Sequence, residues 1–541
     1  MRIKLPPVLS VHEKLPFGRV VQIRESGKTL DCNSVRFTFE KSAGYVFTNY
    51  DGEELFYLFS TRPKETHFSP QVPVLIAKYS VIEGDEVDLS EGQWWQQHGV
   101  VPSRFPAQVA DAAHESWRHA FNFASEDTER SIIGLRKPQL GALHAIHAHW
   151  STSGETATIV MPTGTGKTET MLSVLISSMC KRVLVVVPSD ALRAQIAEKF
   201  ETLGILKIPG NKILAEKALR PVVGRLTSGP KSSTDVDSFF ERCNVVVTTS
   251  QLLGGLRKEV QSRIAHWCTH LFIDEAHHAE ARTWRSFRER FVGKRVLQFT
   301  ATPFREDGQK IDGLLIYIYP LKAAQDEGYF RPIKFHPINE FNKDRGDRKI
   351  AEAALKALDD DTSGKHIVMA RVDSRNRAEE IYELYRSMGR HEAIMIHSGM
   401  TPTLVRAEKQ KLFDGAARIV VCVDMLGEGF DLPELKIAAF HDIRKSLSVT
   451  LQLAGRFTRA REDLGDALFI TNIALIEVQE ELRLLYTREP DWNSLLPELS
   501  STAIESERVS QQFFQGFERF LDEVPLKDLR PAASMVVYET N

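Results

Sequence analysis

IVMPTGTGKTET, residues 159–170, begins as an apolar run and leads into residues typical of a helix. Gly164 and Gly166 allow the backbone to turn with its amide groups facing inward, and a helix starting near Lys167 adds partial positive charge. Lys167 could then reach the β- and γ-phosphates of a nucleotide, and Thr168 could ligate Mg²⁺. The predicted phosphate loop comprises Thr163, Gly164, Thr165, Gly166, Lys167 and Thr168.

One residue departs from the general phosphate-loop pattern. Met161 stands where that pattern has its first glycine. The alternative is a glycine-bearing turn with an incidental Lys-Thr pair. Because strand, loop and helix signals fall in the order that the motif needs, we favour the phosphate site.

A second motif, DEAH at residues 274–277, closes another apolar run. Asp274 is placed to hold Mg²⁺ through water, and Glu275 to orient or deprotonate an attacking water. An isolated Asp-Glu pair is usually part of a solvated loop. Combined with a phosphate loop in the same sheet, it predicts a catalytic pair. His277 is either a coupling residue or a helix-capping or surface histidine.

Composition limits the class of protein. A chain of 541 residues is too long to fold around one hydrophobic core, so we expect several domains. The net charge of −3 neither indicates nor excludes a nucleic-acid partner. Five scattered cysteines without a CxxC pair disfavour zinc and disulfides. Neither a signal peptide nor an apolar run of membrane-spanning length is evident. We therefore expect a cytoplasmic protein, associated with the nucleoid if bacterial, without a membrane partner.

Apolar β-branched runs alternate with helical stretches in two successive series, which is typical of parallel sheets covered by helices. The first series predicts a domain at 132–328 and the second a domain at 329–474, with a break at 336–349. A β-rich accessory domain is expected at 1–107, a helical linker at 108–131 and a helical extension at 475–541. The strand-like last residues of that extension suggest truncation before a further domain.

The β-rich assignment rests on residues 33–59. Val35, Phe37 and Phe39 alternate with polar residues as in a half-buried strand, and Asp51-Gly52 predicts a hairpin turn. Trp94 and Trp95 could stack on bases, but packing in a core or interface is the favoured use of such a pair.

Between Leu135 and Asn472 the ordered motifs resemble those of the superfamily 2 DEAD/DEAH-box-type helicases and translocases. The resemblance implies an α/β fold with two tandem RecA-like parallel-sheet domains, after a β-rich domain and before a mainly helical extension. It assigns nucleotide contacts to Gln139 (adenine), Glu428, Gly429 and Asp431, and a catalytic role to Arg456 and Arg459 of LQLAGRFTRA beside Lys167, Asp274 and Glu275. It assigns coupling of hydrolysis to movement to His277, Thr300, Thr302 and Gln452. It assigns nucleic-acid contacts to Pro188, Ser189, Thr249, Arg371 and Ser398.

The final motif departs from the family pattern at Phe457 and Thr458, the latter often glycine. TATPFRED and GEGFDLPE resemble restriction-enzyme motor subunits and excision-repair helicases, which favours DNA over RNA. The resemblance therefore implies an ATP- and Mg²⁺-dependent helicase or translocase on DNA. The alternatives are an ATP-dependent DNA clamp or sensor, or a motor subunit of a nuclease-containing restriction or defence complex.

Two basic clusters keep open interpretations. The arginines of ARTWRSFRERF could line a nucleic-acid path or form a solvated helix face paired with Glu280 and Glu289. LHAIHAHW carries three histidines without a neighbouring cysteine or carboxylate, so we interpret them as structural or surface residues. The arginines are Arg282, Arg285, Arg288 and Arg290, and the histidines are His144, His147 and His149.

Overall fold

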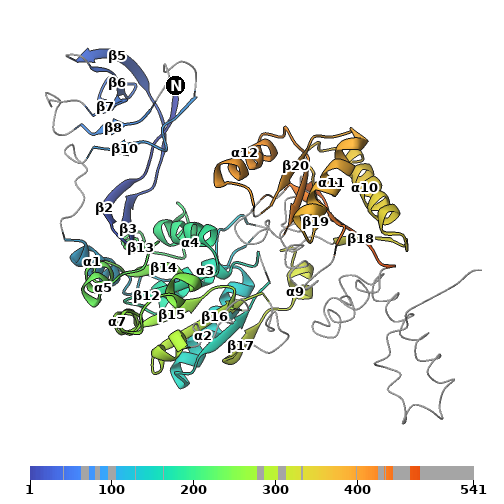
Figure 1. Cartoon of the computed structure of the whole chain (residues 1–541). Helices are drawn as coiled ribbons and strands as arrows, with labels where there is room; N and C mark the ends of the chain where they lie inside the picture. The colour runs from blue at the N-terminus through green and yellow to red at the C-terminus, as the bar shows by residue number, and fades with distance from the viewer. Residues whose placement is uncertain are drawn as a thin grey trace, which may run out of the picture. The chain divides into compact units, whose positions relative to one another are not determined.

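The computed structural model divides into two compact units, Met1–Tyr319 and Pro320–Asn541, each described here by itself. Figure 1 shows their helices and strands. The structure describes residues 1–39, 42–62, 72–78, 86–95, 105–127, 130–162, 164–276, 286–301, 312–329, 333–397, 399–423, 432, 434–442 and 464–474. In these ranges, no helix combines the length and apolar character that crossing a bilayer requires.

A large mixed sheet forms the centre of the first unit. From β17 to β13 every neighbouring pair is parallel, whereas β13–β3 and β3–β2 are antiparallel. In the described residues its spatial order is β17 (Leu314–Ile318), β11 (Ala157–Val160), β16 (Arg295–Thr300), β15 (His270–Ile273), β12 (Val183–Val187), β14 (Val245–Thr249), β13 (Val223–Leu226), β3 (Gly18–Glu25) and β2 (Val8–Leu15).

Alternate residues of the central strands enter two hydrophobic clusters, one on each face of the sheet. Val185 and Phe272 pack in one cluster with α2 and α3, and Leu184 and Leu271 pack in the other with α5 and α7. This burial on both faces confirms the prediction made from the continuous apolar runs. The described helices of this unit are α1 (Pro106–Ser116), α2 (Lys137–Thr152), α3 (Lys167–Ser177), α4 (Asp190–Thr202), α5 (Ser233–Phe240), α6 (Ser250–Gly254) and α7 (Lys258–Trp267), with short 3₁₀ turns at Gly204–Lys207 and Glu289–Phe291.

The pairing of β3 with β13 corrects one expectation. Residues 1–107 were predicted to form a separate accessory domain, yet β2 and β3 extend the central sheet. Val11 and Val20 are buried in the same cluster as Leu184 and Val246. Sequence separation hides this relationship, because a strand's partner about 200 residues away leaves no local pattern.

The remaining N-terminal strands form two smaller sheets. One has the order β4 (Thr29–Asp31), β1 (Arg2–Lys4), β9 (Glu86–Asp88), and the other β10 (Gln93–Trp94), β8 (Val74–Ile76), β7 (Glu54–Phe59), β6 (Ser42–Thr48), β5 (Asn33–Phe39). The predicted hairpin is confirmed: β6 and β7 are antiparallel, and Gly52 takes a φ of +86° in the turn. Trp94 donates its indole N–H to the Pro6 carbonyl at 3.2 Å, which supports packing.

The inward face expected for β5 is wrong at Val35, which is 58% exposed. Val35 pairs with Val46, whereas the buried Tyr45 and Phe47 pair with Arg36 and Ser34. Because side chains alternate across a strand, Val35 lies on the face opposite that core. The Phe37 and Phe39 side chains lie outside the described part of the structure.

The second unit contains a parallel sheet, as the second series predicted. Helices α10 and α11 cover one face of it (Figure 1). Val368, Ala370 and Ile437 are buried in the hydrophobic cluster between these helices and the strands. Its described strands, in spatial order, are β18 (Ile333–Ile338), β23 (Ala467–Asn472), β22 (Leu435–Phe440), β19 (Ile367–Val372), β21 (Ile419–Val423) and β20 (Ala393–Ile396). Its described helices are α9 (Leu321–Asp326), α10 (Lys343–Asp359), α11 (Arg375–Met388) and α12 (Pro402–Phe413).

The break expected at 336–349 is wrong. This stretch holds the end of β18 and the start of α10, with Asn342 capping the helix by accepting the Arg345 backbone N–H. Its polar residues are those of a strand end and a helix N-terminus, which read as a loop when taken alone. The expected helical extension at 475–541 lies outside the described residues.

Candidate nucleotide and nucleic-acid site

The candidate residues of the first unit follow neighbouring parallel strands. Met161 follows β11, Thr300 ends β16, Asp274 follows β15, Pro188 follows β12, and Thr249 ends β14. The carboxyl ends of parallel strands meet at one edge of a sheet, which is where α/β proteins bind their ligands. Sequence positions spread over some 140 residues therefore converge on a single edge.

The phosphate loop has the backbone geometry that its glycines predict. Gly164 and Gly166 take φ values of +90° and +96°, and Gly166 caps the N-terminus of α3. A Cβ atom on Gly166 would lie 1.9 Å from Nε2 of Gln139. Thr165 is fully buried, and its hydroxyl donates to the Pro162 carbonyl at 2.7 Å. The loop is thus held in a tight turn, and Thr168 lies half-buried in the first turn of α3.

The departure at Met161 has a packing explanation. The Met161 side chain is fully buried, and its sulfur accepts the Thr170 hydroxyl at 3.8 Å. Its backbone N–H donates to the Thr300 carbonyl at 2.9 Å, which joins the loop to the end of β16. The side chain therefore enters the core under α3 and leaves the turn to the two glycines.

Lys167 and Glu275 form an ion pair, with 2.7 Å between Nζ and Oε1. The two side chains are 9% and 12% exposed, so water screens the pair only weakly. Asp274 is buried beside them, and one of its carboxylate oxygens accepts the Glu275 backbone N–H at 3.1 Å. Three predicted catalytic side chains therefore gather at one place.

The backbone of Glu275 is strained. Its φ of +47° lies in the left-handed region, which costs a non-glycine residue about 1 kcal/mol or more. The preceding residue, Asp274, stays in register with β12, because its backbone N–H donates to the Val186 carbonyl at 2.9 Å. The strain turns Glu275 out of the strand direction and toward Lys167.

Gln139 contacts the phosphate loop from α2. Its amide oxygen accepts the Arg136 backbone N–H at 2.8 Å, and its amide nitrogen lies against Gly166. Arg136 in turn donates to the Gly164 carbonyl at 3.0 Å. Both residues precede the loop in sequence and hold it in space. The adenine contact of Gln139 stays a prediction.

The candidate nucleic-acid contacts of the first unit cap helices. Ser189 accepts the Leu192 N–H at 3.4 Å at the start of α4, and Thr249 accepts the Leu252 N–H at 3.3 Å at the start of α6. Val187 and Thr249 are register partners on β12 and β14, so the two caps are neighbours. As acceptors, both hydroxyls keep a proton that can be donated to a phosphate oxygen.

The first of the two basic clusters, the arginines of residues 281–291, makes contacts within its own domain. Arg288 binds Gln298 at 3.1 Å and Asp312 at 3.0 Å, and Arg290 binds Gln261 at 3.1 Å. These contacts tie both arginines to their own domain, with partners other than the expected Glu280 and Glu289. Arg282, Arg285 and Glu280 lie outside the described residues.

The three histidines are structural. His147 contacts the Ser177 hydroxyl at 3.0 Å, His149 the Glu155 carbonyl at 2.9 Å, and the His144 ring stacks on Phe123.

Within the described ranges, no three His, Cys, Asp or Glu side chains gather in a way that would hold a metal ion. A Mg²⁺ ion would instead be held by Asp274, Thr168 and the nucleotide's own phosphates, a donor set that suits Mg²⁺.

In the second unit, Arg371 lies near the carboxyl end of β19. It is 6% exposed, its guanidinium lies 5.9 Å from the Phe440 ring centroid, and its carbonyl accepts the His441 N–H at 3.1 Å. A backbone hydrogen bond thus joins Arg371, the candidate contact on β19, to His441, the residue that follows β22.

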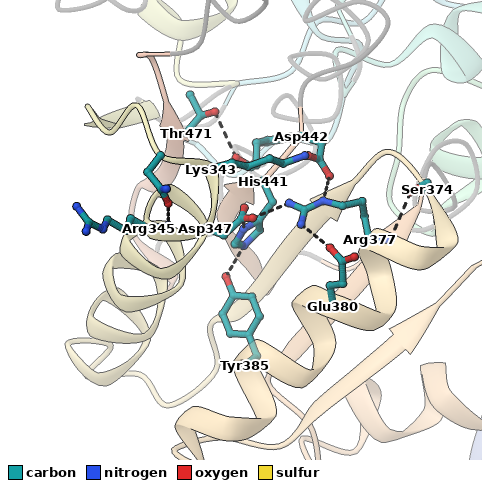
Figure 2. A network of polar contacts seen from close by, with 12 residues as sticks. Lys343, Arg345, Asp347, Ser374, Arg377, Glu380, Tyr385, His441, Asp442 and Thr471 are labelled. Carbon is teal, nitrogen blue, oxygen red and sulfur yellow. Dashed lines mark hydrogen bonds and ion pairs between the residues drawn. The ribbon is translucent and has the colours of Figure 1, made fainter. Parts of the chain in front are cut away.

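Sequence reasoning missed a polar network at this edge (Figure 2). Arg377, in the first turn of α11, donates to Asp442 at 3.0 Å, Asp347 at 2.7 Å and Glu380 at 2.8 Å. The signal was absent from the sequence because Asp347 and Asp442 lie 30 and 65 residues away from Arg377.

The network extends into the core through His441. Its Nδ1 lies 2.8 Å from Asp347, and its Nε2 lies 3.2 Å from the fully buried Tyr385 hydroxyl. Burial alone would raise the pKa of Asp442, but the hydrogen bond and charge of Arg377 outweigh it and lower that pKa. The same hydrogen bonds raise the pKa of Arg377 against its own burial.

Several predicted site residues lie outside the described part of the chain. They are Thr163, His277, Thr302, Ser398, Glu428, Gly429, Asp431, Gln452, Arg456 and Arg459, together with Phe457 and Thr458. Their roles stay predictions.

Two family models match the chain. Residues 132–305 match the model described as "Type III restriction enzyme, res subunit", and residues 349–461 match "Helicase conserved C-terminal domain". The two segments together span more than half of the chain. The chain belongs to the superfamily 2 helicases and translocases, and the parallel strands of its two sheets, with their helices, are the RecA-like domains of that family.

A curated relative, a "51.5 kDa protein" of Lactococcus phage (isolate 7-9), is 23% identical over 222 residues. The match covers 38% of this chain and 49% of that protein, so the chain spans about half the length of the relative.

Three of the similar solved structures illustrate the likeness in fold. The ATP-dependent Type ISP restriction-modification enzyme LlaBIII bound to DNA is 18% identical with a TM-score of 0.46, over 64% of this chain and 28% of that one. The DUF1998 helicase MrfA bound to DNA is 19% identical with a TM-score of 0.45, over 66% and 48%. Mss116p bound to ssRNA and AMP-PNP is 15% identical with a TM-score of 0.47, over 71% and 82%.

Proposed function

We propose that the protein is an ATP-dependent helicase or translocase that acts on DNA. The observation that carries the proposal is the Lys167–Glu275 ion pair beside Asp274, at the sheet edge that also bears Ser189 and Thr249. A phosphate loop, an acidic pair and two helix caps on adjoining strands suit a protein that binds ATP and a nucleic-acid strand together.

In this proposal, ATP binding exchanges the partner of Lys167. The ammonium group leaves Glu275 for the β- and γ-phosphates, and the released carboxylate orients and deprotonates the attacking water. Asp274 and Thr168 would hold Mg²⁺, which when bound would neutralise charge on the phosphate oxygens. The charge that develops on the γ-phosphoryl oxygens needs a further cation, and the motif order assigns Arg456 and Arg459 to that role.

Ser189, Thr249 and Arg371 would contact the phosphate backbone of the strand. Backbone contacts carry no base sequence, so a core of this kind moves along a strand irrespective of its sequence. The preference for DNA over RNA rests on the resemblance of TATPFRED and GEGFDLPE to DNA-acting members of the family.

The test compares ATP hydrolysis by the full chain with single-stranded DNA, duplex DNA and RNA at two salt concentrations. We expect DNA to stimulate hydrolysis more than RNA, with the stimulation weakening as salt rises. Lys167→Ala should abolish hydrolysis, whereas Lys181→Ala, which removes an exposed lysine, should not. Stimulation by RNA alone would reverse the choice of substrate.

A second candidate is a motor subunit of a nuclease-containing restriction complex. The match of residues 132–305 to a restriction-enzyme subunit family favours it. A strand-displacement assay run beside the hydrolysis assay separates the mechanisms. DNA-stimulated hydrolysis without displacement indicates a duplex translocase or a clamp, and co-purification with a nuclease indicates the restriction role.

A further inference from the structure

A cavity of about 590 Å³ lies outside the candidate ATP site, between the β2–β3 pair and the strands β8 and β10. One part of its lining is apolar and aromatic, and includes Leu9, Ile76 and Trp94. The other part is charged, and includes His12, Arg19, Arg62, Glu91 and Glu201. The volume lies within the range of small-ligand sites, and the lining combines apolar and aromatic side chains with ionic groups.

Arg19, which belongs to the charged part of the lining, stands in a row of like charges on neighbouring strands. Lys14 on β2, Arg19 on β3 and Arg225 on β13 are direct cross-strand partners. Like charges placed opposite each other destabilise a sheet, so such a row is held against its own repulsion. Glu201 neutralises Arg225 with two bonds of 2.8 and 2.7 Å, but it lies 3.8 Å from Arg19.

Arg19 therefore keeps unused binding capacity. Burial and the neighbouring charge of Arg225 lower its pKa, although it stays cationic. Its Nε atom is buried and donates to no acceptor in the described part of the protein. The Arg19 side chain is 42% exposed, so its guanidinium can contact an anionic ligand more closely than the 3.8 Å that separates it from Glu201.

Two further contacts order other residues of the lining. The guanidinium of Arg62 lies 4.7 Å from the centre of the Trp95 ring, a cation–π contact that restricts where its N–H groups lie. The Trp94 ring is fixed by its hydrogen bond to Pro6. Planar donors beside an indole match a ligand that combines a phosphate with a flat ring.

We propose that this cavity binds a nucleotide unit of a nucleic-acid strand, with the phosphate on Arg19 and Arg62 and the base against Trp94 and its apolar neighbours. The site is a second contact with the nucleic acid, separate from the helix caps Ser189 and Thr249. Glu201 belongs to α4, the helix that Ser189 caps, so a single rigid element joins the cavity to the candidate strand contact.

The test uses the full chain carrying Lys167→Ala and no ATP, so that its outcome does not depend on hydrolysis. A fluorescein-labelled thymidine oligonucleotide of about 20 nucleotides is titrated by anisotropy. Arg19→Gln and Arg62→Gln remove the proposed contacts. Arg24→Gln is the matched control, because Arg24 lies on the same strand, lines a different cavity and has a 61% exposed side chain.

We expect Arg19→Gln to weaken binding about tenfold, and to reduce the salt slope of log K by about 0.7. Arg24→Gln should change neither. Because Arg19→Gln also relieves repulsion in the cationic row, its melting temperature should be no lower than that of Arg24→Gln, which separates lost binding from lost structure. Equal affinities for Arg19→Gln and Arg24→Gln would overturn the proposal.

Thymidine 5′-monophosphate, added as a competitor, distinguishes the two sources of this chemistry. Competition that is lost in Arg19→Gln indicates a site that accepts a free nucleotide. Weaker strand binding in Arg19→Gln, without competition by the mononucleotide, indicates a site that takes only a strand. Strand binding through this cavity by a chain that hydrolyses no ATP even with Lys167 intact would contradict the proposed function and leave this inference standing.

Discussion

Nζ of Lys167 lies 2.7 Å from Oε1 of Glu275, so two side chains needed for the proposed hydrolysis are each other's partners. ATP must compete with Glu275 for Lys167. The same exchange delivers a carboxylate to the water only when a nucleotide has taken the lysine, which would limit the catalytic arrangement to the loaded protein.

Glu275→Gln is expected to separate binding from turnover. An amide cannot deprotonate water and pairs less strongly with Lys167, so hydrolysis should fall by at least about 100-fold while an ATP analogue binds as tightly or more tightly. Binding is measured by calorimetry and turnover by phosphate release. An analogue that binds much more weakly to Glu275→Gln would contradict the exchange of partners.

Gly166→Ala tests the phosphate loop. The new Cβ would meet Gln139 Nε2 at 1.9 Å, and the φ of +96° disfavours any L side chain, at a cost of about 1–3 kcal/mol. We expect lost nucleotide binding and a lower melting temperature. Gly154→Ala is the control, since its Cβ would meet nothing within 4 Å. Thermal denaturation with and without nucleotide compares the two variants.

Arg377→Ala should destabilise the second unit. It leaves the buried carboxylates of Asp347 and Asp442 without their main cation, which typically costs about 3–5 kcal/mol. Arg386→Ala removes an exposed i,i+3 pair and should cost less than about 1 kcal/mol. Denaturant unfolding measures both. Equal costs would mean that the network contributes little to the fold.

The same network predicts acid sensitivity. Arg377 lowers the pKa of Asp442, so this carboxylate stabilises the fold above its unfolded pKa near 4, and the stabilisation is lost as pH falls through the lower folded value. Without Arg377 that pKa rises. The acid midpoint of unfolding, followed by circular dichroism, should therefore move to higher pH in Arg377→Ala, and a midpoint unchanged from wild type would rule this out.

His270 predicts a second pH effect, in the first unit. Burial, and the charge of Arg295, lower its pKa from 6.5 to about 4. The unfolded chain binds this proton first, so the free energy of unfolding falls as pH drops from about 6.5 to about 4, by on the order of 3 kcal/mol. His270→Leu should flatten this slope, whereas His266→Leu, at an exposed position, should not.

Local sequence patterns predicted the strands and turns whose formation depends only on residues close together in the chain. The apolar runs became strands β11, β12, β14, β15 and β16, and the two glycines of the phosphate loop took the positive φ values that their motif requires. Asp51-Gly52 formed its turn for the same reason. Periodicity and turn chemistry are properties of neighbouring residues, so sequence alone exposes them.

Long-range pairing decided the rest. The attachment of β3 to β13, the outward face of Val35 and the binding of Arg377 to Asp347 and Asp442 all depend on residues far apart in the chain. The sequence by itself determined the two parallel-sheet domains and the candidate ATP-site residues, because spacing within each motif carries that chemistry. Only the tertiary structure decided which of them touch, since contact depends on sheet order, which no local pattern encodes.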